Sequence, residues 1–229
     1  MMATGKQKLT QDLKRIEMMV DELVAYLDDD ALFGASLSAG LTTVTLGNYL
    51  MGQNRLLALR STALEAVVQT RLDAVVARFD RVLYYNTEEF KLKVGQELET
   101  RLQGWRGYVR QLTRKEIRAN CYEVEAENRV IVEDILQKLC LLGGQPDSHI
   151  CEEIDRLDRE LRQHWQPGKF IWPAEWKPAY PQSIYWWLYG RPQNIGKARV
   201  KGGEGNTYIP QPRQRLLVDP FLVAETGGV

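Results

Sequence analysis

The sequence predicts a mainly α-helical protein: an elongated, coiled-coil-like bundle, followed by an extended C-terminal arm rich in tryptophan and proline, with room for one short β-hairpin. Two observations predict this. Apolar residues recur at spacings of three and four through most of residues 1–164, which is the period of a helix that buries one face. Eight of nine prolines and five of six tryptophans lie from Trp165 onward. Because proline breaks helices, we divide the chain into a bundle, 1–164, and an arm, 165–229.

The first helix is predicted from a regular apolar stripe near the start of the chain. Its members are spaced 4-3-4-3-4, the a/d pattern of packed helices. They are Leu9, Leu13, Ile16, Val20, Leu23 and Leu27. Asp28, Asp29 and Asp30 follow, and acids at a helix C-terminus oppose the dipole, so the helix is predicted to end there.

A second helical pattern resumes at about Asn54 and runs to a turn at Tyr84–Asn86. Its predicted buried side consists of Leu57, Leu64, Val68, Val75, Phe79 and Val82. Thr87 is predicted to cap the next helix, because a threonine hydroxyl can accept a hydrogen bond from a free N–H group of the first turn. The stripe of that helix is Leu98, Leu102, Trp105, Val109 and Leu112.

Two further helices are predicted before the arm. Thr113 and Glu116 match a capping box, so a new helix or a kink is expected there. The stripe that follows is Ile117, Cys121, Val124, Asn128, Ile131 and Ile135. Gly143 and Pro146 end this helix, and Asp147 or Ser148 begins the last one, with the stripe Ile150, Ile154, Leu157 and Leu161. The breaks near 28–53, 84–87, 113 and 143–147 separate helices that we expect to pack nearly parallel or antiparallel.

Residues 31–53 form a stretch of 23 residues without a charge. Its length is sufficient to cross a bilayer, but Gly, Ser, Thr and Asn keep its hydropathy low for a membrane span. A buried helix or helix–loop inside the bundle is the favoured interpretation. Association with a membrane and a mobile loop are the alternatives.

The start of the arm, residues 165–192, carries more aromatic side chains than a soluble protein normally leaves exposed to solvent. They cover the helical body, enter a groove of a partner, or line a ligand surface. Coverage of the body is the simplest explanation. For binding to a partner, the candidate residues are Trp172, Trp176, Trp186, Trp187 and Tyr189.

A basic stretch follows at residues 191–215, in which Glu204 is the one acid. Its six basic residues are Arg191, Lys197, Arg199, Lys201, Arg213 and Arg215. Residues 198–201 and 206–209 flank a glycine-rich tip, and this pattern predicts a short hairpin. A basic hairpin beside stacking aromatics is an alternative site for nucleic acid, and a solvated loop is the other interpretation.

The sequence contains no catalytic, metal-binding or cofactor-binding motif with the residue spacing that such a site requires. The histidines are His149 and His164, and the spacing of His149 to Cys140 and Cys151 lacks the paired knuckle of a zinc site. The sequence contains no Glu-x-x-His pair and no phosphate loop. We therefore predict no catalytic residue, no metal and no cofactor.

Charge and cysteine content set the remaining bounds. Residues 1–164 carry 22 basic and 26 acidic residues and residues 165–229 carry 8 and 4, although the whole chain has no net charge. Three cysteines, including Cys121, do not make an even disulfide framework, and the first residues lack the apolar core of a signal peptide. Both observations favour the cytoplasm.

These observations favour a non-enzymatic structural or adaptor subunit of a larger protein assembly. Helical seams and the aromatic arm are expected to join it to a protein partner or to a second copy. The first alternative is a nucleic-acid-binding accessory protein that uses residues 191–215. The second is a membrane-associated factor that uses residues 31–53.

Overall fold

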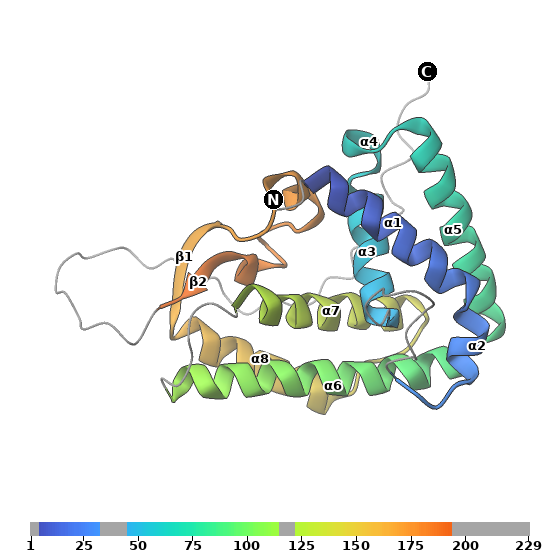
Figure 1. Ribbon diagram of the computed structural model, residues 1–229. Coiled ribbons are helices and arrows are strands. Elements are labelled where there is room, and N and C mark those ends of the chain that lie inside the picture. Colours follow the sequence, from blue (N-terminus) through green and yellow to red (C-terminus); the bar gives the residue numbers. More distant parts are fainter. Residues whose placement is uncertain (1–4, 33–44, 115–121, 194–229) are drawn as a thin grey trace, which may run out of the picture. The chain divides into compact units, whose positions relative to one another are not determined.

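The computed structural model describes residues 5–32, 45–114 and 122–193 (Figure 1). The chain divides into two units, Met1–Gly196 and Lys197–Val229, and the described residues belong to the first. The fold is mainly α-helical, as predicted. In chain order the elements are α1 (Gly5–Asp21), α2 (Leu23–Asp28), α3 (Leu46–Ala58), α4 (Arg60–Ala63), α5 (Ala66–Tyr85), α6 (Thr87–Thr113), α7 (Tyr122–Leu141), α8 (Ser148–Arg162), β1 (Trp165–Phe170), η2 (Ala174–Ala179), η3 (Trp186–Leu188) and β2 (Tyr189–Pro192).

The first predicted stripe is confirmed, although it spans two helices. All six of its residues are buried, and the helix is interrupted at Glu22 between α1 and α2. The chain leaves α2 at Asp28, where the three acids predicted the end. The helix ends here because further helical turns would place these carboxylates at the negative end of the helix dipole, which is unfavourable.

Helix α3 lies at the centre of the described helices and contacts α1, α5, α6 and α7 (Figure 1). It is buried on nearly all sides, including at Gly47 and Gly52, where neighbouring helices come close. The predicted buried helix is therefore confirmed for residues 46–53, while residues 33–44 lie outside the described residues. Within the described ranges, no helix is long and apolar enough to cross a membrane.

The prediction of one continuous helix from Asn54 to Val82 is wrong. The chain bends at Leu59 and again at Leu64, so that the segment contributes to α3, α4 and α5. Leu57 is exposed and Leu56 faces the core instead, because Leu57 and Leu64 do not share one helix. Helix α5 buries Leu72, Val75, Phe79 and Leu83.

The turn between α5 and α6 is confirmed at Asn86, which occupies the N-cap position one residue before the predicted Thr87. The Thr87 hydroxyl instead donates to the carbonyl of Leu83. The predicted stripe of α6 is buried along its whole length, from Leu98 to Leu112. Helix α6 ends at Thr113, and the rest of the expected capping box lies outside the described residues.

Helix α6 packs against α7 and α8, and its contact with α7 is the more extensive. The predicted seam of α7 is wrong at Val124, which is 68 % exposed, because the buried face holds Tyr122, Ala126 and Arg129 instead. The predicted break after α7 is confirmed. Gly143 has a positive φ of 72°, and Asp147 caps α8 by accepting a hydrogen bond from the backbone N–H of His149.

Residues 165–193, here called the aromatic segment, form an antiparallel strand pair closed by η2 and η3. Trp165 pairs with Pro192 and Phe170 with Tyr189. Gly190 has a φ of 146°, and a Cβ there would lie 2.3 Å from the carbonyl oxygen of Gln166, so only glycine fits. The hairpin predicted at residues 198–209 lies outside the described residues.

Candidate functional site

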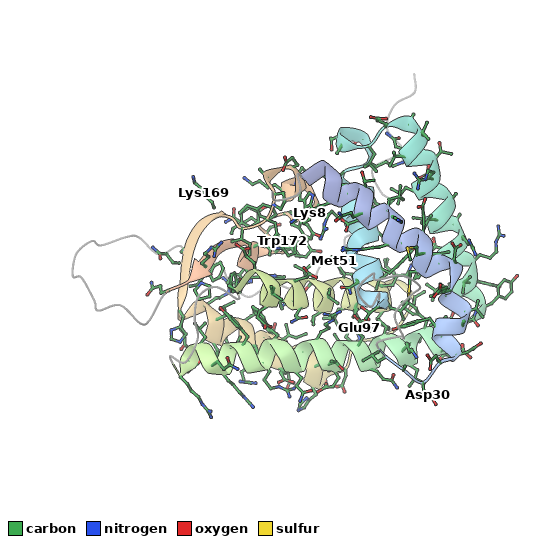
Figure 2. The ribbon with its side chains drawn as sticks, in the orientation of Figure 1. Lys8, Asp30, Met51, Glu97, Lys169 and Trp172 are labelled. Carbon is green, nitrogen blue, oxygen red and sulfur yellow. The ribbon has the colours of Figure 1, made fainter. Side chains whose placement is uncertain are left out.

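The aromatic segment packs onto helices α1, α3 and α7, where it contacts three buried ionisable side chains. Helix η2 contacts both α1 and α3. Figure 2 shows Lys8 and Trp172 in the region where the segment meets α1. The candidate site predicted from the sequence is thus joined to the helical body by polar and aromatic contacts together.

Arg55 of α3 is the first of these charged residues. Its Nη1 donates to Oδ2 of Asp12 over 2.7 Å, and its Nε donates to the hydroxyl of Tyr180 over 2.9 Å. The guanidinium carbon lies 3.7 Å from the ring centroid of Trp176. Burial raises the pKa of the Asp12 carboxyl, whereas the charge of Arg55 acts in the opposite direction. This cluster links α1, α3 and the aromatic segment at one point.

Asp134 of α7 is the second. The hydroxyl of Tyr185 donates to its Oδ1 over 3.0 Å, and the other oxygen, Oδ2, is buried without a hydrogen-bond partner among the described residues. Burial raises the pKa of Asp134 to about 7, while Asn54, Tyr185 and Arg55 act in the opposite direction. A carboxyl in this position prefers its neutral form, because the charged form would lose its hydration.

Arg129 of α7 is the third. It is almost fully buried, and its Nη2 lies 3.1 Å from Oδ2 of Asp158 on α8. Its guanidinium carbon lies 4.1 Å from the ring centroid of Trp187, and the hydroxyl of Tyr122 donates to the backbone carbonyl of Trp187. Trp187 is therefore enclosed by α7 and by its own segment.

The structure brings the five predicted partner-binding residues together, but against the helices of the same chain. Trp176, Trp187 and Tyr189 are buried, and Trp172 and Trp186 are half-buried. The hydroxyl of Tyr189 donates to the carbonyl of Tyr180 over 2.7 Å. In this conformation the three buried side chains stabilise the fold, which corresponds to the simplest explanation of the aromatic content. Their binding to a partner stays a prediction.

The structure describes only part of the basic stretch that was predicted as an alternative site for nucleic acid. Arg191 forms an ion pair with Glu123 on the surface, whereas the other five basic residues of the predicted site lie outside the described residues. Cys140 is a free thiol. In the described ranges, no group of three acid, histidine or cysteine side chains is placed to hold a metal ion.

Glu97 of α6 is a buried carboxylate that sequence reasoning missed. It accepts hydrogen bonds from the hydroxyl of Thr45 and, over 2.8 Å, from the backbone N–H of Gly47 at the start of α3. Arg101 pairs with it over 3.1 Å. The negative charge of Glu97 suits the positive end of the α3 dipole, so α6 fixes the start of the central helix. The sequence signal was a charged residue beside the apolar stripe position Leu98.

Among the described residues, the most exposed aromatic side chains lie elsewhere, at the junction of α5 and α6. Tyr84 and Tyr85 are 78 % and 76 % exposed, and their ring centroids lie 5.1 Å apart. Leu92, on α6, is 67 % exposed and lines a hollow of about 100 Å³ with Glu89. The hollow also includes Asp28, Asp29 and Asp30 at the end of α2.

We call this surface the tyrosine end. The name covers Tyr84 and Tyr85 at the end of α5 together with Glu88, Glu89 and Leu92 in the first two turns of α6. The hollow beside Leu92 is lined by Asp28, Asp29 and Asp30 and also by Lys93. The hollow is smaller than the roughly 300 Å³ at which small-molecule pockets begin. The geometry therefore suits one inserted side chain of a partner better than a cofactor.

Comparison with protein-family models, with curated proteins and with solved structures found no match to this chain.

Proposed function

We propose that this protein is a non-enzymatic adaptor or structural subunit that binds a protein partner through the tyrosine end. The observation that carries the proposal is the exposure of Tyr84 and Tyr85, whose rings contact each other at the end of α5. Tyrosine supplies a large contact area with only two rotatable side-chain bonds, so ordering it in an interface costs little entropy. Tyrosine is also enriched among the residues that dominate binding energy.

Charge indicates the chemistry of the partner. Glu88 and Glu89 lie in the first turn of α6, directly after the tyrosine pair, and both are exposed. Asp28, Asp29 and Asp30 face the same hollow as Leu92. The partner surface is accordingly a protein segment with apolar side chains flanked by lysine or arginine, because opposite charge speeds association and selects among partners.

The helix dipole supports this assignment for the aspartates. Acids at the N-terminus of α6 are stabilised by the dipole of that helix, but Asp28 and Asp29 stand at the C-terminus of α2, where the dipole disfavours them. Each such charge costs about 0.3–1 kcal/mol in stability. Lys93 of α6 lines the same hollow and donates to the backbone carbonyl of Asp29, so the fold meets part of this charge and the exposed remainder faces solvent.

The test replaces the tyrosine pair and compares it with an equally exposed apolar pair. The test variant is Tyr84→Ser/Tyr85→Ser, and the matched control is Val67→Ser/Val124→Ser, which removes exposed side chains from the first turns of α5 and α7. The tagged full-length protein is isolated from the cells that naturally produce it, and the proteins that copurify with it are identified. The identified partner is then purified separately. Binding of the purified partner is measured by calorimetry.

The tyrosine variant is expected to bind the purified partner about tenfold to thirtyfold more weakly, and the valine control is expected to match the unchanged protein. Added salt is expected to weaken binding of the unchanged protein, because the proposed contact is partly ionic. Equal affinity of both variants would contradict the tyrosine end as the binding surface. If the unchanged protein associates only with itself, the proposal of an adaptor would be replaced by that of a self-assembling subunit.

A further inference from the structure

The arginines of the described helices divide into a paired group and an unpaired group. Of the 15 arginines in the described residues, ten form an ion pair with an acid. The remaining five are Arg81, Arg110, Arg114, Arg159 and Arg162. Four of these five lie at the ends of just two helices, α6 and α8. We call these four residues the arginine end.

The two helix ends lie on the same side of the bundle. Helices α6 and α8 are in contact, and Figure 1 shows both ending on the side where β1 begins. Arg106 donates to Glu153 through two nitrogens, which sets α6 and α8 in register. One turn beyond this ion pair, α6 continues to Arg110 and α8 continues toward Arg159. In both helices, the unpaired arginines therefore lie on the C-terminal side of the Arg106–Glu153 ion pair.

Nearby acids are already occupied by other arginines. Glu153 accepts from Arg106, and this contact lowers the pKa of the Glu153 carboxyl. Glu160 accepts from Arg156, one turn away on the same helix. Helix α6 has no acid after Glu99, and Asp155 on α8 forms no ion pair with Arg159, four residues further on. Arg162 is close enough to Asp158 for an electrostatic interaction, whereas Arg110, Arg114 and Arg159 form no ion pair with a described acid.

The helix dipole explains why arginines lie at each helix end but not why the two ends lie together. Basic residues in the last turn of a helix interact favourably with its carbonyl groups, and this accounts for their presence at the ends of α6 and α8. It does not account for two such ends being brought together on one side. Gathering like charges raises their mutual repulsion, which a bound anion relieves.

We infer that the arginine end binds the phosphate backbone of a nucleic acid, without reading its sequence. Guanidinium groups match phosphate oxygens through two parallel hydrogen bonds, and four of them span more than one phosphate. Trp186 does not offer a free face for base stacking at this end, because the guanidinium carbon of Arg162 lies 3.7 Å from its ring centroid. Contacts to phosphates rather than to bases are thus what the surface provides. Because it uses other residues, this inference stands apart from the partner proposed for the tyrosine end.

The experiment measures binding of the full-length protein to a short fluorescein-labelled single-stranded RNA by fluorescence anisotropy, in a series of salt concentrations. The test variant is Arg110→Gln/Arg159→Gln, which removes one unpaired charge from each helix. The matched control is Lys14→Gln/Arg81→Gln, since both residues are exposed and lie in helices α1 and α5 without an ion pair in the described structure. Circular dichroism confirms that both variants keep their helix content.

The test variant is expected to bind roughly tenfold more weakly at about 50 mM salt, while the control keeps its affinity. The dependence of the logarithm of affinity on the logarithm of salt concentration is expected to become shallower by about 1.5 in the test variant only. No binding by the unchanged protein, or equal weakening in both variants, would overturn the inference. Loss of binding only on replacing Lys197, Arg199 and Lys201 would also overturn it. Binding to phosphatidylserine vesicles but not to RNA would assign the surface to a membrane instead.

Discussion

Aromatic side chains are buried in one region of this molecule and exposed to solvent in another. In the aromatic segment, Tyr180 and Trp187 are almost fully buried, and the Tyr180 hydroxyl accepts a hydrogen bond from Arg55. At the tyrosine end, Tyr84 and Tyr85 are more than three-quarters exposed and form no hydrogen bond with any described residue. The comparison teaches that aromatic content locates apolar surface but does not say which partner covers it. In one region the chain covers its own aromatics, and in the other it leaves them to solvent.

The same contrast predicts where substitution affects stability and where it affects association. A buried aromatic residue contributes to folding through its packing, so its loss is visible in the isolated protein. An exposed pair contributes little to folding, so its loss is visible only when a partner is present. Each substitution below tests one side of this contrast.

The largest effect is expected for Trp187→Ala. The side chain is 1 % exposed and packs on Arg129, so its removal leaves a cavity and an uncovered guanidinium. The free energy of unfolding is expected to fall by about 3–5 kcal/mol, measured by urea denaturation. A loss below about 1 kcal/mol would contradict the buried position.

Asp134→Asn is expected to change the pH dependence of stability. The folded carboxyl has a pKa of about 7, above the roughly 3.9 of an exposed aspartate, so the folded state holds its proton more tightly. Stability from this group is present at low pH and is lost as pH rises from about 4 to about 7. An asparagine cannot ionise, and it keeps an acceptor for the Tyr185 hydroxyl.

The variant should therefore gain stability relative to the unchanged protein as pH increases. The difference in unfolding free energy is expected to grow by on the order of 2–3 kcal/mol between about pH 5 and about pH 8. Urea denaturation of both proteins at each pH measures it, and the remaining titrating groups, including Asp12, cancel in the comparison. A difference that does not vary with pH would show that Asp134 is ionised in the folded protein.

Gly47→Ala tests the helix on which the aromatic segment lies. An added Cβ would come within 2.3 Å of the Ile131 side chain and 2.7 Å of the Glu97 carboxylate. Displacing these groups is expected to cost about 1–3 kcal/mol in unfolding free energy, despite the better helix propensity of alanine. Gly95→Ala on α6 is the matched control, since a Cβ there meets no atom within 4 Å. Equal stability of the two variants would contradict the close approach of α3 and α7.

Much of the helical fold follows from local periodicity. The stripes of α1, α6 and α8 were predictable because each buried residue lies three or four positions from the next, and neighbouring turns suffice to reveal this. The same rule selected Leu57 and Val124, which are exposed. It failed at Leu57 because the pattern joined Leu57 and Leu64, which do not share one helix. It failed at Val124 because the buried face of α7 carries Arg129 and other polar residues that periodicity assigns to the surface.

The buried charges could not be predicted in the same way, because their partners are distant in sequence. Arg55 and Tyr180 are 125 residues apart, and Asp134 and Tyr185 are 51 apart. A buried charge is tolerated only when it is paired and hydrogen-bonded, and the pairing exists only once the chain has folded. Whether the aromatic segment would cover its own helices or those of a partner depended on these contacts, so the sequence left both alternatives open.

The smallest effect on stability is expected at the tyrosine end, for Tyr84→Ser/Tyr85→Ser. Both rings are mostly in solvent, so the unfolding free energy should change by less than about 0.5 kcal/mol in either direction. Removing exposed apolar surface should also raise solubility, which sedimentation at increasing concentration measures. A loss of stability as large as that of Gly47→Ala would show that the pair packs within the fold. The contrast between the two aromatic regions would then disappear, and with it the reason to place a partner at the junction of α5 and α6.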